Sequence, residues 1–286
     1  MSSACLYASR QFHIIVVLAA NIGITEHQMT DTTIPIARGL TRWQASGIHL
    51  LISAAIAAGA LFITLRVWYP PPLFTAEGGS ELLFILVAVD VVIGPLITLV
   101  IFKSGKPGLR FDLSVIALFQ ACALVYGCHV MFVARPVFIV LAMDQFETVR
   151  ANDLDAADLA QAPDPAFRSL PLTGPVFVAV ELPKDMKQLR EIIAETQKSG
   201  KIVTHLPRYY VSYAQHKTKA VTQSRALDPA VKRGGDFATL AQKFLAESGR
   251  KASDLNYIEL QTRRGFGAVL IDAKSGEIVT LLPPKL

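Results

Sequence analysis

Three long apolar segments, separated by short polar connections, dominate the first half of the chain. They cover about residues 46–68, 82–102 and 113–133. A helix of about 20 apolar residues crosses the hydrocarbon core of a bilayer, and each segment reaches that length with few charged side chains. The pattern therefore predicts three transmembrane α-helices, which together form a transmembrane domain over residues 41–135.

The pattern changes after residue 135, where apolar residues occur in short runs. The runs VFIVLAM, FETVR and VFVAV are typical of strands. Residues 183–200 and 236–249 carry the spacing of amphipathic helices, with Asp236 as the expected N-cap of the second. Three further strands are expected near the end, with turns at Arg264–Gly265 and Lys274–Gly276. Residues 136–286 are thus predicted to form a small α+β extramembrane domain.

Composition supports a membrane protein. The chain is 52% hydrophobic and 18% charged, with a mean hydropathy of +0.40, which is too apolar for an ordinary soluble domain. The net charge of +5 is interpreted as topology signals with a mildly basic soluble face. No basic-aromatic motif of a nucleic-acid module is present, so the lipid bilayer is an expected partner and nucleic acid is not.

The cysteines give no sign of a cofactor. They are Cys5, Cys122 and Cys128, and no C-x-x-C motif or Cys/His cluster accompanies them. We therefore expect no metal and no bound cofactor. The tail after residue 135 has no cysteine, which is compatible with an oxidising compartment.

Residues 1–40 stand apart from this pattern. They contain one short apolar run, residues 12–24, which is too short to span a bilayer comfortably. No clean cleavage site of a signal peptide follows it. We interpret these residues as a poorly ordered extension, with Met29 as an alternative start of the protein.

Basic residues predict the topology. Arg38 and Arg42 precede the first span, and the connection Lys103–Arg110 after the second span carries four basic residues and no acid. By the positive-inside rule both segments are cytoplasmic. Three spans then place residues 136–286 in the periplasm of a Gram-negative cell. Asp112 is the expected cap of the third span.

An acidic residue interrupts the second span. Asp90 lies within the apolar run, and Gly94 and Pro95 follow it by one turn. A charge at this depth costs about 2.5–3.5 kcal/mol on insertion scales, so it should face a partner rather than lipid. Pro95 removes a backbone hydrogen bond and Gly94 leaves room beside it, so the three residues predict a polar notch.

Three interpretations of Asp90 remain open. It is a structural residue within the helix bundle, it binds a polar group of an incoming transmembrane helix, or it carries protons or takes part in catalysis. The last is weakest, because an aspartyl protease needs two carboxylates that share a proton. Asp112 lies at the other end of the spans, and no G-x-G-D motif is present.

Two further groups are candidates for partner binding. The first span is rich in small residues, including Ala54 and Ala58, which allow close approach of another helix in lipid; ordinary packing onto the other two spans is the alternative. In the tail, Tyr209 and Tyr210 stand near His205. A Tyr-rich strand with surface histidines is favoured over a metal site there, and tyrosines suit protein contact.

Several of these stretches together resemble the type IV pilin accessory proteins of the TfpX/TfpZ type. They are RWQASGIHLLISAAIAA, VWYPPPLF, LVAVDVVIGPLITLVIF, GLRFDLSVIALFQACALVYG and ARPVFIVLAMDQFETVRANDL. The resemblance is close over residues 41–154 and general in the tail.

The resemblance implies a non-enzymatic protein of the bacterial inner membrane with a periplasmic domain. Such a protein acts with a cognate type IV major pilin as an assembly chaperone. We expect Asp90, Gly94, Pro95, Ala54 and Ala58 to cradle the apolar helix of the pilin, and the tail to contact its globular head. The alternative is a membrane sensor or a subunit of an envelope complex with an unrelated ligand.

Overall fold

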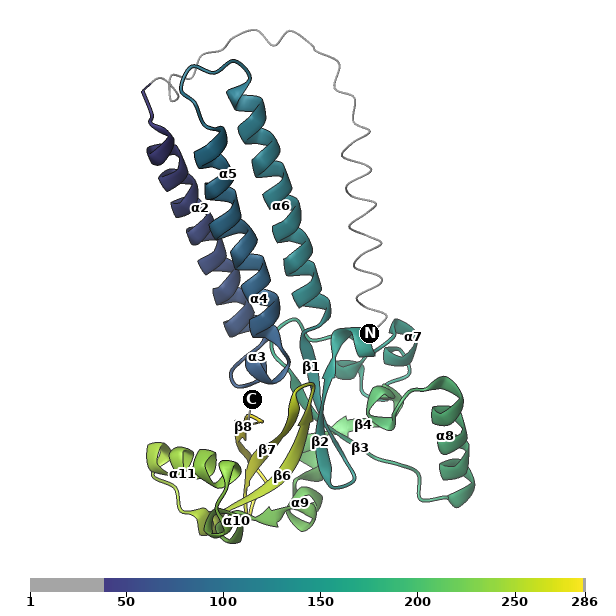
Figure 1. The fold of residues 1–286 in the computed structure, drawn as a ribbon. Coiled ribbons are helices and arrows are strands. Elements are labelled where there is room, and N and C mark those ends of the chain that lie inside the picture. The colour runs from purple at the N-terminus through teal and green to yellow at the C-terminus, as the bar shows by residue number, and fades with distance from the viewer. Residues whose placement is uncertain (1–38, 285–286) are drawn as a thin grey trace. The chain divides into compact units, whose positions relative to one another are not determined.

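The computed structural model describes residues 39–284, so the expected N-terminal extension, with Met29, lies outside the described residues apart from its last two positions. Within this range, three helices are long and apolar enough to cross a membrane (Figure 1). The predicted number of spans is confirmed. We call Arg42–Trp68 span one, Gly79–Ile101 span two and Leu109–Val133 span three.

Two of the spans contain π-helical turns. Span one is α2 (Arg42–Ile63) followed by the π-helical η2 (Thr64–Trp68). Span two is α4 (Gly79–Val87), the π-helical η3 (Ala88–Ile93) and α5 (Gly94–Ile101), and span three is α6 (Leu109–Val133).

Span three begins earlier than the sequence suggests. Its N-cap is Gly108, which has a left-handed φ of +79°, a conformation that glycine adopts without a steric penalty. The expected cap, Asp112, is therefore wrong, because this residue already lies in the first turn. There its carboxylate faces the positive end of the helix dipole and accepts from the ammonium of Lys106 at 2.6 Å.

Span two packs between the other two spans (Figure 1). α2 contacts α5 and η3, whereas α6 contacts α4, η3 and α5. Close contact between spans two and three occurs at Gly127, where an added Cβ would lie 2.5 Å from Leu86. Large apolar side chains such as Leu51, Phe62 and Val100 remain exposed on the outside, as a lipid environment requires.

The connection between spans one and two is part of the extramembrane domain. It contains α3 (Leu73–Ala76), and the side chain of Leu73 is fully buried in the same apolar cluster as Ile139, Phe146 and Val269. The hydroxyl of Tyr69 donates to the carbonyl of Met131 at 2.9 Å. This connection therefore links the spans to the domain core.

The domain is built on one sheet with strand order β4-β3-β1-β2-β6-β7-β8, and β5 pairs with β6 at the side. The strands are β1 (Pro136–Ala142), β2 (Gln145–Arg150), β3 (Val176–Val180), β4 (Tyr210–Ser212), β5 (Arg225–Ala226), β6 (Leu255–Thr262), β7 (Gly265–Asp272) and β8 (Ile278–Leu282). The pairs β1–β3 and β2–β6 are parallel, and the other pairs are antiparallel.

Strand β1 is buried along its whole length. It follows span three after only Ala134 and Arg135, and its apolar side chains face clusters on both sides of the sheet. The final meander β6–β7–β8 is present as predicted, with its first turn at Arg263 and Arg264, one residue earlier than expected.

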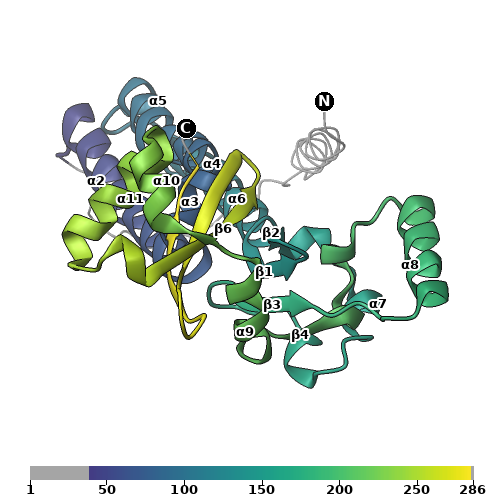
Figure 2. The ribbon, with the colours of Figure 1, turned by 90° about the horizontal axis from the view of Figure 1, so that it is seen from below.

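Helices flank opposite ends of the sheet (Figure 2). They are α7 (Ala156–Leu159), α8 (Met186–Ser199), α9 (Tyr213–Gln223), α10 (Leu227–Arg233) and α11 (Asp236–Ser248). α8 lies beyond the β3–β4 side, and α10 and α11 lie on the β6 side. The cap of α8 is Asp185, whose carboxylate accepts from Lys187 N at 3.1 Å. In α11 Asp236 is the first helical residue rather than the N-cap, which is Gly235.

Short 3-10 turns complete the domain. They are η4 (Ala151–Asp153), η5 (Pro165–Phe167), η6 (Val203–His205), η7 (Pro207–Tyr209) and η8 (Ala252–Asp254). The expected Tyr-rich strand is therefore wrong in extent, since β4 has only three residues and Tyr213 begins α9. Tyr210 and Tyr213 are both buried, in the two apolar clusters that lie on opposite sides of the sheet.

Candidate intramembrane binding site

The local structure around Pro95 explains the polar residues of span two. In η3 the hydrogen bonds follow the π-helical spacing, and Gly94 N donates to Val89 O. The next donor in this register would be the N–H of Pro95, which proline lacks. The carbonyl oxygen of Asp90 is thereby left without its helical partner, and the side-chain amide of Gln120 in span three donates to it at 3.1 Å.

His49 connects all three spans. Its Nδ1 lies 2.6 Å from Thr98 Oγ1 in span two, and its Nε2 lies 2.7 Å from Gln120 Oε1 in span three. Because an amide oxygen only accepts, Nε2 carries the proton, and in a neutral ring Nδ1 then accepts from the Thr98 hydroxyl. The bonds run in one direction from Thr98 through His49 and Gln120 to the Asp90 carbonyl. We call these four residues the polar chain.

A further hydrogen bond joins spans one and two at the same level. The hydroxyl of Ser46, one turn before His49, donates to the carbonyl of Pro95 at 2.9 Å. Inside a bilayer, where water does not compete, such interhelical hydrogen bonds contribute about 0.6 kcal/mol each and up to about 1.7 kcal/mol. The bonds of Ser46 and the polar chain therefore favour one register of the three spans.

The carboxylate of Asp90 is enclosed. The residue is 6% exposed, and its Oδ1 has no hydrogen-bond partner among residues 39–284. Gly94 and Pro95 are also buried. A Cβ added to Gly94 would lie 2.0 Å from Gln120 Nε2, so the space that the glycine leaves is occupied by Gln120. The predicted notch is thus filled from within the chain.

The small residues of span one lie elsewhere. Ala54 and Ala58 are exposed, whereas Ser53 and Thr64 on the same helix are buried. A Cβ added to the neighbouring Gly59 would meet nothing within 4 Å. The structure brings Asp90, Gly94 and Pro95 together, but it places Ala54 and Ala58 on the outer surface rather than beside them.

The two tyrosines of the tail have different environments. Tyr210 is fully buried and its hydroxyl donates to the carbonyl of Thr204; burial raises the pKa of its phenol strongly. Tyr210 is therefore a core residue and forms no surface in this structure. Tyr209 is partly exposed, and the guanidinium of Arg208 lies 4.9 Å from the centre of its ring.

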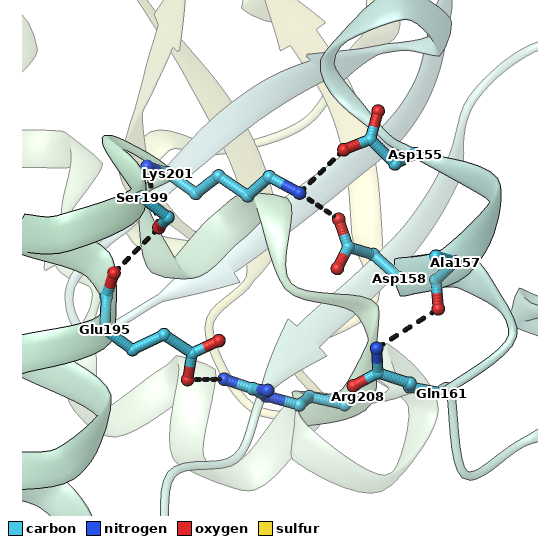
Figure 3. A network of polar contacts seen from close by, with 8 residues as sticks. All are labelled: Asp155, Ala157, Asp158, Gln161, Glu195, Ser199, Lys201 and Arg208. Atoms are coloured by element: carbon cyan, nitrogen blue, oxygen red, sulfur yellow. Dashed lines mark hydrogen bonds and ion pairs between the residues drawn. The ribbon is translucent and has the colours of Figure 1, made fainter.

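Arg208 belongs to a polar network that connects α7 and α8 (Figure 3). It pairs with Glu195 of α8, while Lys201, just after this helix, pairs with Asp155 at 2.7 Å and with Asp158. These contacts fix the C-terminal end of α8 beside Tyr209. Within the described part of the chain, no three His, Cys, Asp or Glu side chains are grouped to hold a metal.

Sequence reasoning missed three members of the polar chain, His49, Thr98 and Gln120. A signal was available, because Ser46, His49 and Ser53 recur at helical spacing within an apolar run. It could not identify their partners, since the contacts join residues 49 and 71 positions apart.

The chain is similar to known fimbrial assembly proteins. The family model described as fimbrial assembly protein FimB matches residues 37–78. A fimbrial assembly protein of serogroup I from Dichelobacter nodosus is 29% identical over 243 residues, which cover 83% of this chain and 89% of that protein. The fimbrial assembly protein of serogroups C1 and C2 from the same organism is 34% identical over 119 residues, which cover 41% of this chain and 91% of that protein. The chain belongs to the fimbrial assembly protein FimB family. No solved structure matches it significantly.

The FimB match covers two features described above. Residues 37–78 include span one, with Ser46 and His49, and the connection that carries Leu73 and Glu77. In this FimB family member the matched segment therefore contributes both to the contacts between the spans and to the core of the extramembrane domain. The finer TfpX/TfpZ assignment stays a prediction.

Proposed function

We propose that the chain acts in pilus assembly as an accessory protein of the TfpX/TfpZ type, and that it binds the transmembrane helix of a cognate type IV major pilin. Its membership of the fimbrial assembly protein family supports a role in assembly. The names of these relatives mention no binding partner, so the pilin is part of the proposal. The protein would shield an apolar helix until that helix enters the pilus.

The exposed face of span one is the proposed docking surface. Ala54 and Ala58 are separated by one helical turn and lie on this face, where small side chains allow the backbones of two helices to approach closely. In lipid this packing drives association, because the hydrophobic effect gives no advantage between apolar helices. This exposed small-residue face is the observation that carries the proposal.

Asp90, Gly94 and Pro95 have a second role in the proposal. Gln120 occupies the space beside Gly94 and donates to the Asp90 carbonyl. A polar group of the pilin helix would replace Gln120 and meet the carboxylate of Asp90. In the absence of the pilin, the carbonyl of Asp90 accepts from Gln120, while the carboxyl oxygen Oδ1 has no partner among residues 39–284 and would be available to the pilin.

The proposed topology follows from the distribution of charge. Arg42 and the connection Lys103–Arg110 lie at the same end of the spans, and the domain that begins with β1 lies at the other end. The positive-inside rule places the basic end in the cytoplasm and the domain in the periplasm, with the spans in the inner membrane. The domain, including the partly exposed Tyr209, would contact the globular head of the pilin.

Site-specific photocrosslinking in membranes tests the proposal. A photoreactive residue at Ala58 should give a crosslink to the pilin, whereas one at the exposed Lys274 of the β7–β8 turn should not. A probe at Val91, beside Asp90, should crosslink only if the pilin helix reaches span two. Crosslinks to the pilin found only in residues 136–286 would exclude binding of the pilin's transmembrane helix by the spans. No pilin crosslink at any position would favour an envelope-complex subunit or sensor.

A further inference from the structure

The sheet of the extramembrane domain divides between β2 and β6. These strands pair in parallel over three residue pairs, from Gln145–Glu259 to Glu147–Gln261. Each strand then continues, to Arg150 and to Thr262, without pairing to the other. A cavity of about 150 Å³ lies at this division, and we call it the fork cavity. It has room for about five water molecules or one small polar molecule.

Glu77, from the connection between spans one and two, enters the fork cavity. It is 4% exposed, and its carboxyl group accepts a long hydrogen bond of 3.4 Å from the backbone N–H of Arg263 and lies beside the hydroxyl of Thr148. Burial raises the pKa of this carboxyl, because the nearby cations do not fully offset the loss of water. A buried carboxylate that is held only by a long bond from Arg263 and by the nearby Thr148 can accept further hydrogen bonds from a ligand.

Thr148 lies beside Glu77 on the wall of the cavity. It is 8% exposed, and within the described chain its hydroxyl forms no hydrogen bond of ordinary geometry, although it lies near the carboxyl group of Glu77. Buried hydroxyl groups in folded proteins are nearly always paired. An unpaired hydroxyl on the wall of a polar cavity is therefore explained by an occupant that forms the missing bond.

The charges of the cavity wall indicate what kind of occupant fits. Arg150 and Asp153 neutralise each other in a two-pronged pair with contacts of 2.9 and 3.0 Å. The remaining charged or ionisable side chains are the acids Glu77 and Glu147 and the bases Arg263 and His205. Glu147 accepts from the Thr204 hydroxyl at 2.6 Å through one of its two oxygens. The wall can thus serve an ammonium group and a carboxylate group at once.

We propose that the fork cavity binds a small zwitterion with one ammonium and one carboxylate group, of the size of glycine or alanine. The ammonium group would donate to Glu77, to Glu147 and to the oxygen of Thr148. The carboxylate group would accept from Arg263 and His205. This site is separate from the face of span one, so it stands or falls independently of the proposed role in pilus assembly.

Thermal unfolding of the full chain in detergent tests the proposal. Glycine or alanine should raise the unfolding midpoint in a saturable manner, because a ligand that binds the folded state stabilises it. Methylammonium and acetate at equal concentration carry one charged group each and should give little shift. Equilibrium dialysis with labelled glycine should give one molecule per chain.

Two pairs of variants locate the site. Thr148→Val removes the hydroxyl at nearly constant shape and should weaken binding at least tenfold, whereas Thr148→Ser should retain it. Glu77→Gln should weaken binding similarly, and Glu191→Gln, at an exposed position of α8, should not. Equal shifts with acetate or methylammonium, no shift with either amino acid, or binding that survives both Thr148→Val and Glu77→Gln would overturn the proposal.

Discussion

The spans bury polar side chains beside apolar ones such as Leu86 and Met131, whereas the central strand of the extramembrane sheet buries apolar side chains alone. In the spans the buried positions include Ser53, Thr64 and Thr98, while Val100 is 80% exposed. In the sheet Val137, Phe138, Ile139 and Val140 of β1 are all fully buried. Both regions belong to one chain, so the difference reflects the surroundings for which each region is built.

The comparison shows that two different forces hold the two regions together. The domain gains about 25 cal/mol for each Å² of apolar surface that leaves water. The spans gain little in this way, since lipid is as apolar as their side chains, and close packing and hydrogen bonds decide their arrangement. Substitution of Leu73 tests apolar burial in the domain, and substitutions that disturb the polar chain test hydrogen bonding between the spans.

Truncating Leu73 should have the largest effect. The side chain is fully buried in the domain core although it belongs to the connection between spans one and two. Leu73→Ala should lower the free energy of unfolding by about 2–5 kcal/mol, because it leaves a cavity. Thermal unfolding in detergent, followed by circular dichroism, measures this. The control Leu172→Ala, at a position 65% exposed, should change little; an equal loss in both variants would contradict the assignment of Leu73 to the core.

Filling the space beside Pro95 should have the next largest effect. Gly94→Ala places a methyl group where Gln120 Nε2 lies, and so breaks its bond to the Asp90 carbonyl. We expect a loss of about 1–2 kcal/mol, from one intramembrane hydrogen bond and the displaced amide.

Gly59→Ala is the matched control for this change, because an added Cβ there meets nothing within 4 Å. Both substitutions replace a helical glycine by alanine, which by itself favours the helix. Unfolding of the spans in bicelles should therefore separate the two variants. Stabilisation by Gly94→Ala would show that the polar chain does not hold the spans.

The pH dependence of stability tests the burial of Glu77, which belongs to the connection between spans one and two. The pKa of Glu77 in the folded chain is raised above its ordinary value of 4.5, mainly by burial. The folded state then binds this proton more tightly than the unfolded state, so the contribution of Glu77 to stability falls as pH rises from 4.5 through the raised value.

Glu77→Gln should remove that decline. The variant should gain stability relative to the parent chain as pH rises towards neutrality, and the two should converge below pH 4.5. Unfolding midpoints measured across this range give the difference. A difference that grows towards low pH would reverse the sign and refute the role of burial.

Breaking the exposed ion pair between Arg264 and Glu81 should have the smallest effect on the free energy of unfolding. Arg264 of the β6–β7 turn pairs with Glu81, which is 69% exposed at its side chain. Arg264→Gln should cost about 0.2–1 kcal/mol at low salt and less at high salt. Lys232→Gln, which breaks the exposed pair with Asp228 in α10, is the comparison. If Arg264→Gln lowered the free energy of unfolding several times more than Lys232→Gln, the Arg264–Glu81 pair would be a main contact between the domain and span two.

Much of the fold follows from local patterns. Spans one to three, the amphipathic helix α8 and the β6–β8 meander depend on runs, periodicity and turn residues that a reader can find in the sequence. The candidate site was harder to predict from the sequence. Asp90, Gly94 and Pro95 stand out because they violate an apolar pattern, whereas Gln120 and Leu73 look ordinary until their neighbours are known.

The sequence by itself determined that the chain has three spans, that an α+β domain follows them, and that Pro95 follows Asp90 by little more than one helical turn. These are properties of neighbouring residues, set by apolar length, by periodicity and by the missing N–H of proline. Only the tertiary structure decided that Gln120 fills the space at Gly94, that Ala54 and Ala58 face outwards, that Tyr210 is buried, and that Leu73 and Glu77 enter the domain. The physical reason is that each of these depends on contacts between segments far apart in the chain, which local preference does not specify.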